Sequence, residues 1–252
     1  MKHQSNILAL KYRPLNFQDL IGQEYLVETI QKSIQQNKIP NAYIFTGIRG
    51  VGKTTTARIV AKMLNCTVFD KNNNPDLINC EQAKAITEDR HPDVIEIDAA
   101  SNTSVENARE IIENVKYNPV LGKYKVYIVD EVHMLSKSAF NALLKTLEEP
   151  PPHSKFIFAT TEISKVPITI LSRCQRFDLR RVEKKTLSDF LKSIAKKEDI
   201  TISNEALNLI VKASDGSVRD SLSILDQANI CLLYTSDAAD DMQCVDLGGR
   251  RI

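Results

Sequence analysis

The chain has 252 residues, of which 42% are hydrophobic and 26% are charged, values typical of a globular protein with a packed core. Its formal net charge of +1 provides no global basic field, so any contact with nucleic acid must depend on a local patch. No apolar run approaches the ~20 residues of a membrane-spanning helix, and the N-terminus lacks a signal-peptide core. We therefore expect a cytoplasmic protein of one large or two smaller domains, with no membrane partner.

The first predicted features are an extended lead-in and a helix. Pro14 keeps Arg13 out of the α region of backbone conformation. The aromatic side chains of Tyr12 and Phe17 either pack within an N-terminal arm or offer a flat pocket to an adenine base. Residues 24–36 then carry apolar side chains at helical spacing, which predicts an amphipathic helix.

Residues 47–54, GIRGVGKT, fit the G-x-x-x-x-G-K-[ST] pattern of a phosphate-binding loop between an apolar strand and a helix. The glycines let backbone N–H groups approach phosphate oxygens, and the helix N-terminus adds partial positive charge. We expect Lys53 to reach the β- and γ-phosphates and the Thr54 hydroxyl to hold Mg²⁺. A chance glycine turn before a helix is the alternative. The predicted ATP-binding residues are Tyr12, Arg13, Gly47, Ile48, Arg49, Gly50, Val51, Gly52, Lys53, Thr54 and Thr55.

Two later apolar runs end in polar residues that complete such a site. Residues 126–133, VYIVDEVH, have the Walker B form, in which a buried strand ends in two acids. Asp130 is expected to hold Mg²⁺ through water, and Glu131 to orient or deprotonate the attacking water. Adjacent acids after a strand are otherwise a common turn. The run FIFATTE ends in Thr160 and Thr161, where a polar side chain can sense the γ-phosphate; we assign this sensor 1 role to Thr161.

The pattern DEVHMLSKSAFNALLKTLEEPP…FIFATTE…SRC, preceded by YRP and IGQ near the N-terminus, is similar to the gamma/tau subunits of bacterial DNA polymerase III. These subunits are AAA+ clamp-loader ATPases, and the resemblance covers about residues 8–230. It implies an α/β AAA+ P-loop NTPase domain with a parallel sheet over residues 1–180, and a small, truncated helical lid domain over residues 181–230. It also implies that Arg173 of the SRC motif is an arginine finger acting in trans, and that Arg219 is a sensor 2 residue contacting the γ-phosphate in cis.

The resemblance implies a motor subunit that hydrolyses ATP, with Mg²⁺, to load a ring-shaped sliding clamp onto primed DNA. The implied partners are other clamp-loader subunits, the clamp, primed DNA and, through a missing C-terminal region, the polymerase core. The polymerisation chemistry belongs to another subunit. One alternative is an ATP-inert scaffold subunit of the same ring, but the intact Lys53, Thr54, Asp130 and Glu131 argue against it. Another is a P-loop kinase, which does not explain the SRC and GSVRD motifs.

The bacterial motor subunits that the chain resembles bind zinc through four cysteines, and here only Cys66 and Cys80 stand at matching positions. Leu77 and Ala83 occupy the other two. A structural zinc site needs four ligands, so we expect this degenerate site to be non-functional and zinc to be absent. The remaining cysteines are too scattered for a disulfide framework.

The stretch from Cys231 onward resembles no part of the family. Residues 231–240, CLLYTSDAAD, match a translated transposon-end adapter of sequencing libraries, and residues 244–252 match a translated flow-cell adapter. We therefore expect residues 231–252 to be a non-native translation product. No functional role is expected of this tail.

Overall fold

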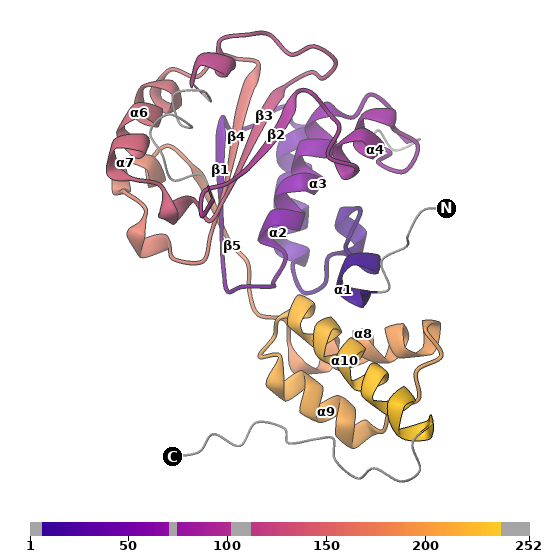
Figure 1. Cartoon of the computed structure of the whole chain (residues 1–252). Coiled ribbons are helices and arrows are strands. Elements are labelled where there is room, and N and C mark those ends of the chain that lie inside the picture. The colour runs from indigo at the N-terminus through magenta and orange to yellow at the C-terminus, as the bar shows by residue number, and fades with distance from the viewer. Residues whose placement is uncertain (1–6, 71–74, 102–111, 238–252) are drawn as a thin grey trace. The chain divides into compact units, whose positions relative to one another are not determined.

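The structure is a computed structural model that describes residues 7–70, 75–101 and 112–237 (Figure 1). It divides into two compact units. The larger unit spans Arg13–Val182, and the second combines the chain from Glu183 onward with the segment that ends at Tyr12. Most of the tail expected to be non-native, residues 238–252, lies outside the described residues.

The larger unit is built on a five-stranded sheet in the order β2-β3-β4-β1-β5. All four strand pairings are parallel, as the sequence led us to expect. Parallel neighbours need crossover connections, and helices supply most of them. The strands are β1 (Ala42–Thr46), β2 (Val94–Asp98), β3 (Lys125–Asp130), β4 (Ser154–Thr160) and β5 (Gln175–Asp178).

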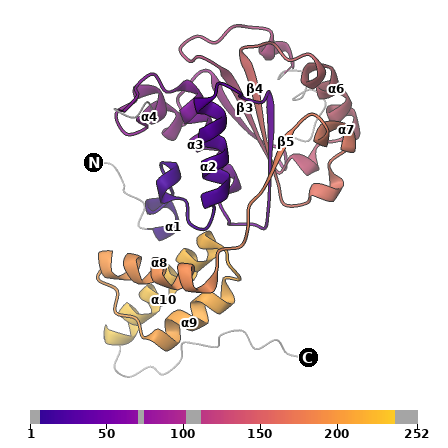
Figure 2. The same ribbon diagram turned by 180° about the vertical axis from the view of Figure 1, so that it is seen from behind.

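The central strands are buried along almost their whole length because both faces of the sheet are covered. Alternate side chains of β1 enter two different clusters: Tyr43 and Phe45 belong to one, and Ala42 and Ile44 to the other. Figures 1 and 2 show the corresponding helices on the two faces. One face carries α2 (Glu24–Gln35), α3 (Lys53–Asn65) and α4 (Glu81–Thr87), and the other carries α6 (Lys137–Glu148) and α7 (Ile168–Leu171).

The parallel arrangement brings the polar ends of several strands to one edge of the sheet. Asp98 at the end of β2 is paired in register with Asp130 at the end of β3, and Thr46 of β1 with Thr160 of β4. Short 3-10 helices follow two of these ends, Val132–Met134 and Ile163–Lys165, and a third, Phe17–Asp19, precedes α2. This carboxyl edge is where open α/β sheets bind ligands.

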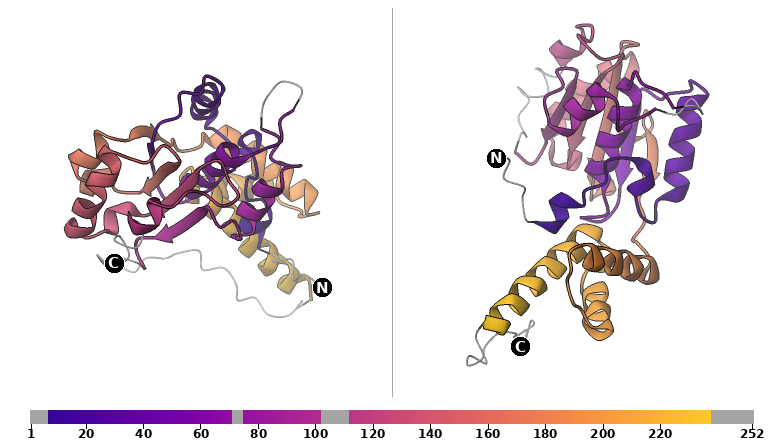
Figure 3. Two further views of the ribbon diagram at one scale, coloured as in Figure 1. Left: turned by 90° about the horizontal axis from the view of Figure 1, so that it is seen from above. Right: turned by 90° about the vertical axis from the view of Figure 1, so that its right-hand side faces the viewer.

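The second unit is helical. It contains α1 (Leu8–Lys11), α8 (Lys184–Lys197), α9 (Asn204–Ala213) and α10 (Val218–Asp237). The last three pack against one another, and α1 packs against α10 (Figure 3). Their interior is formed by apolar side chains at helical spacing, including Leu187, Leu191, Ile194, Leu207, Ile210, Leu222 and Leu225.

The structure differs from the expected domain division at the N-terminus. Residues up to Tyr12 were assigned to the nucleotide-binding domain, yet they group with the helical unit, where Leu8 is buried. The helical lid was expected to end at residue 230, but α10 continues to Asp237, since the added residues contain no glycine or proline to end it. Within the described part of the chain, no helix is both long and apolar enough to cross a membrane.

Candidate functional site

The loop of residues 47–52 joins β1 to α3 and requires glycine at two positions. Gly47 has φ 152°, and a Cβ there would lie 2.7 Å from the carbonyl oxygen of Leu179. Gly52 caps α3 with φ 101°, a left-handed conformation that other residues rarely adopt. The apolar residues of the loop anchor it, because Val51 is buried in the core and Ile48 packs against the same cluster. These two predicted site residues therefore offer a ligand their backbone groups, while Arg49 is exposed.

Lys53 begins α3, and its side chain folds back over the loop. Its Nζ donates hydrogen bonds to the carbonyl oxygens of Gly47 and Ile48, both at 3.0 Å, and only 5% of the residue is exposed. Burial lowers the pKa of this amine, and the nearby carboxylates of Glu131 and Asp130 oppose that shift. The Lys53 amine is thus desolvated at the phosphate loop, and the two nearby acids favour its charged form. A positive charge at this place suits the loop to bind an anion.

Thr54 and Asp130, which are both predicted to hold Mg²⁺, meet across the site. The Thr54 hydroxyl donates to Asp130 Oδ2 at 2.6 Å, and the backbone N–H of Glu131 donates to Asp130 Oδ1 at 2.9 Å. Hydroxyl and carboxylate oxygens are the ligands that Mg²⁺ prefers. Because these oxygens converge beside the phosphate loop, the residues fit a magnesium ion that accompanies a bound phosphate.

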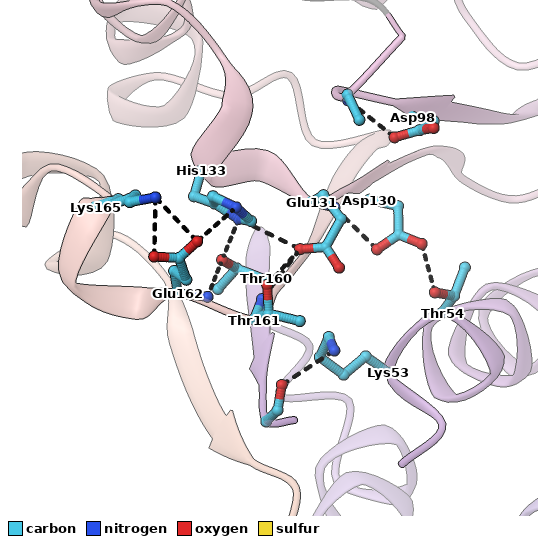
Figure 4. A network of polar contacts seen from close by, with 12 residues as sticks. Lys53, Thr54, Asp98, Asp130, Glu131, His133, Thr160, Thr161, Glu162 and Lys165 are labelled. Carbon is cyan, nitrogen blue, oxygen red and sulfur yellow. Dashed lines mark hydrogen bonds and ion pairs between the residues drawn. The ribbon is translucent and has the colours of Figure 1, made fainter. Parts of the chain in front are cut away.

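Glu131 follows directly and has a strained backbone, with φ 45° and ψ 45°. Left-handed conformations of non-glycine residues are uncommon and often occur at functional sites. The side chain is held by Thr161, whose N–H and hydroxyl donate to Glu131 Oε2 at 3.1 and 2.9 Å. Figure 4 shows Glu131 and Thr161, both predicted to be catalytic, facing each other, with Lys53 and Thr54 close by.

Two residues that the sequence motifs did not indicate also take part in this network. His133 lies in the short helix after β3 and contacts both Glu131 and Thr160, and Glu162 follows Thr161 and contacts His133 (Figure 4). A signal was present, because a histidine placed two residues after the Walker B acids is polar in an otherwise apolar segment.

The remaining predicted nucleotide-binding residues lie on both units. Arg13 donates from Nε to the Thr55 hydroxyl at 3.3 Å, so these two residues are together in the larger unit. Tyr12 belongs to the helical unit, where its hydroxyl donates to Glu198. Burial and this carboxylate raise the pKa of Tyr12 to about 12. A role for Tyr12 at a nucleotide stays a prediction.

The two predicted catalytic arginines are also placed on different units. Arg173 follows α7, and its guanidinium donates to the Thr169 carbonyl oxygen at 2.6 Å and pairs with Glu148. Arg219 is exposed in the first turn of α10. Their roles toward a γ-phosphate stay predictions.

Cys66 and Cys80 are buried together, and Ala83 and Leu77 complete their small cluster. Burial raises the pKa of the Cys66 thiol to about 12. Burial acts in the same direction on Cys80, but hydrogen bonds from the N–H groups of Ala83 and Thr67, among others, outweigh it and lower the pKa of that thiol. The positions expected to carry further zinc ligands thus present apolar side chains to the thiols. Among the described residues, no three histidine, cysteine or acidic side chains form a group that could hold a metal ion.

Comparisons with known proteins agree with the motifs. Residues 22–183 match the family model described as DNA polymerase III, delta subunit, and residues 186–231 match that of the DNA polymerase III clamp loader subunit, ATPase lid domain. The chain is 50% identical over 222 residues to the DNA polymerase III subunit tau/gamma of Haemophilus influenzae, covering 88% of this chain and 32% of the relative. It is 49% identical to subunit tau of Bacillus subtilis, covering 86% of this chain and 38% of the relative.

The chain thus spans about a third of the length of these curated relatives. Among solved structures, it resembles the RuvB Holliday junction branch migration motor of Thermotoga maritima, with a TM-score of 0.65 and 18% identity. That similarity covers 89% of this chain and 67% of RuvB and concerns the fold alone. With the family models matching from residue 22 to residue 231, the chain belongs to the family of DNA polymerase III clamp-loader subunits.

Proposed function

We propose that this chain is the ATPase part of a gamma/tau-type motor subunit, which uses ATP to load a sliding clamp onto primed DNA. The observation that carries the proposal is that one chain brings together the phosphate-binding, Mg²⁺-holding and water-orienting groups. Five residues converge within hydrogen-bond distance of one another or of the phosphate loop: Lys53, Thr54, Asp130, Glu131 and Thr161. An ATP-inert scaffold subunit does not need a desolvated lysine and a strained glutamate at this place.

In the proposed reaction, the loop N–H groups and Lys53 bind the phosphates of ATP, and Glu131 orients the attacking water and accepts its proton. Thr161 fixes the Glu131 carboxylate through two hydrogen bonds. Thr54 and Asp130 are the proposed holders of Mg²⁺, which neutralises charge on the phosphate oxygens when bound. Arg13, Thr55 and Tyr12 are proposed to complete the nucleotide contacts.

Two arginines are proposed to make hydrolysis depend on assembly and on the lid. Arg173 acts in trans, in the site of a neighbouring subunit, where an arginine finger stabilises the charge of the transition state. Arg219 acts in cis as sensor 2. The proposed partners are other clamp-loader subunits, the sliding clamp and primed DNA, which implies a cytoplasmic protein.

Zinc is proposed to play no part, because Leu77 and Ala83 stand beside the two thiols where a tetrahedral site needs ligands.

The test is ATP hydrolysis by the protein assembled with its clamp-loader partners, measured with and without sliding clamp and primed DNA. We expect turnover that clamp and primed DNA stimulate together, and none in a Lys53→Ala variant, which lacks the charge aimed at the β- and γ-phosphates. Binding without turnover in the unaltered assembly would favour the inert scaffold instead.

A further inference from the structure

The side chain of His133 lies between two carboxylates and is 5% exposed. Its Nδ1 is 3.3 Å from Glu131 Oε2 and 3.0 Å from Thr160 Oγ1, and its Nε2 is 3.4 Å from Glu162 Oε1 (Figure 4). Both ring nitrogens thus lie close to oxygen atoms. A histidine that served only to fill the core would not need a carboxylate at each nitrogen.

The surroundings of His133 are fixed at several points. The Thr160 side chain is fully buried, and its hydroxyl accepts a hydrogen bond from the N–H of Glu162 at 3.0 Å. Glu162 is in turn paired with Lys165 at 2.9 Å, which lowers its pKa through the hydrogen bond from that amine. Since a carboxylate only accepts hydrogen bonds, the ring is the donor wherever it bonds to Glu131 or Glu162.

Glu131 is held through one oxygen only. Oε2 lies within reach of Thr161 N, Thr161 Oγ1 and His133 Nδ1, whereas no described residue donates a hydrogen bond to Oε1. A glutamate side chain loses rotamer freedom when it is fixed, and two anchors on one oxygen define its orientation better than one. This arrangement leaves the second oxygen available for a water molecule.

We propose that His133 is a positioning residue for ATP hydrolysis: with Thr161 it fixes the orientation of the Glu131 carboxylate, and it ties that carboxylate to Glu162. The proposal rests on the ATPase function proposed above. A displacement of ~1 Å at a reacting group can cost on the order of a hundredfold in rate. Because His133 does not touch the phosphate loop, its loss affects kcat and leaves nucleotide affinity in place.

Three substitutions separate the two ends of the ring. The amide nitrogen of Asn can take the place of Nδ1, so His133→Asn retains a polar nitrogen beside Glu131 and Thr160 and loses the contact with Glu162. The amide nitrogen of Gln reaches the place of Nε2, so His133→Gln loses the nitrogen beside Glu131. His133→Phe keeps the ring volume and loses both. We expect His133→Asn to retain most of kcat, and the Gln and Phe variants to lose on the order of a hundredfold with unchanged ATP affinity.

The matched control is His153→Asn, because His153 contacts the carbonyl oxygen of Val115 and lies outside this network. Equal kcat values in the unaltered protein and all three His133 variants would overturn the proposal while leaving the proposed ATPase function intact. Absence of turnover in the unaltered assembly would overturn that function, and the role of His133 with it.

A second measurement does not depend on turnover or on folding of the Phe variant. The ring ¹⁵N resonances of His133 report directly on what each nitrogen contacts. Glu131→Gln and Glu162→Gln should each shift them, whereas Asp189→Asn on the helical unit should not. If neither carboxylate substitution moves the His133 resonances, the ring does not join the two acids and the proposal is wrong.

Discussion

The hydroxyl of Thr54 donates a hydrogen bond to Asp130 Oδ2 at 2.6 Å, which joins the start of α3 to the end of β3. The two residues are far apart in sequence, and the contact places both predicted Mg²⁺ ligands at one point beside the phosphate loop.

We predict that Thr54→Ala weakens Mg²⁺-dependent ATP binding by about tenfold or more, because hydrogen bonds and contacts to charged groups contribute about 1.5–3 kcal/mol. Thr54→Ser keeps the hydroxyl and should bind normally. Titration of a fluorescent ATP analogue at several Mg²⁺ concentrations measures both. An unchanged Mg²⁺ dependence in Thr54→Ala would exclude this hydroxyl as a ligand.

Glu131→Gln should separate ATP binding from hydrolysis. The amide keeps the size of the side chain, and its oxygen can still accept from Thr161, but it cannot take a proton from water. Loss of a general base typically costs 10²–10⁴-fold, so we expect kcat to fall by roughly that factor. Nucleotide affinity should stay within about twofold of the unaltered protein. Single-turnover hydrolysis at saturating ATP tests this, and turnover at the normal rate would show that Glu131 is not the base.

Much of this site followed from the sequence, because each motif is local. The glycine loop and the two acids after β3 are short patterns whose geometry depends on a strand and a helix beside them. The contact between Glu131 and Thr161 was not predicted, because it depends on how β3 and β4 lie side by side. The left-handed backbone of Glu131 carries no sequence signal either, since glutamate is not a residue that usually marks such conformations.

The N-terminal segment shows a different limit of sequence reasoning. YRP resembles a family opening, and that resemblance places Tyr12 in a nucleotide pocket. In the structure, α1 packs on α10, while Lys11 pairs with Glu198 at 2.7 Å and the Tyr12 hydroxyl donates to the same carboxylate. A four-residue helix has no local pattern that reveals which distant helix will cover it.

The cysteine cluster predicts a defined metal response. As isolated, the protein should contain no stoichiometric zinc, because Leu77 and Ala83 face Cys66 and Cys80. Replacing both with cysteine, Leu77→Cys with Ala83→Cys, restores four thiolates at one place and should yield about one tightly bound zinc per chain. Metal analysis by mass spectrometry decides both points. Zinc in the unaltered protein that disappears in Cys66→Ser would contradict the first.

Asp93 predicts an acid-dependent loss of stability. Asp93 is 1% exposed, and its carboxylate accepts hydrogen bonds from the N–H groups of Val120, Leu121 and Gly122, each at 2.7 Å. Burial alone would raise the pKa of Asp93, but these donors outweigh it and lower the pKa. A lowered folded-state pKa means that the stabilisation is present above the unfolded value of ~3.9 and is lost as pH falls through the folded value.

Asp93→Asn should therefore lower the free energy of unfolding by about 3 kcal/mol at neutral pH, since an amide N–H₂ cannot accept from these donors. The difference from the unaltered protein should shrink as the pH falls below ~4. Urea unfolding at several pH values measures it. Asp89→Asn is the control: Asp89 is an exposed acid that pairs with Arg58, and pairs with an exposed partner contribute about 1 kcal/mol at most. A similar loss of unfolding free energy in both variants would show that the Asp93 carboxylate has no special role in stability.

Arg173 provides the test of assembly. In the single chain its guanidinium contacts the Thr169 carbonyl oxygen and Glu148, both of which belong to its own unit. If the proposed role in trans is right, Arg173→Ala leaves ATP binding by the isolated chain unchanged. It lowers hydrolysis in the assembled ring by on the order of a thousandfold. Arg176→Ala, which removes a nearby exposed pair with Asp178, should leave both quantities unchanged.

Mixed rings then decide which site Arg173 serves. One subunit carries Arg173→Ala and a neighbour carries Lys53→Ala, in either order around the ring. When the two substitutions face the same interface, they disable one site and the other sites hydrolyse ATP normally. In the reverse order they disable two sites, and the residual rate per ring falls further. Equal rates in the two orders would mean that Arg173 acts within its own chain or has no catalytic part, and the proposed dependence of hydrolysis on assembly would be wrong.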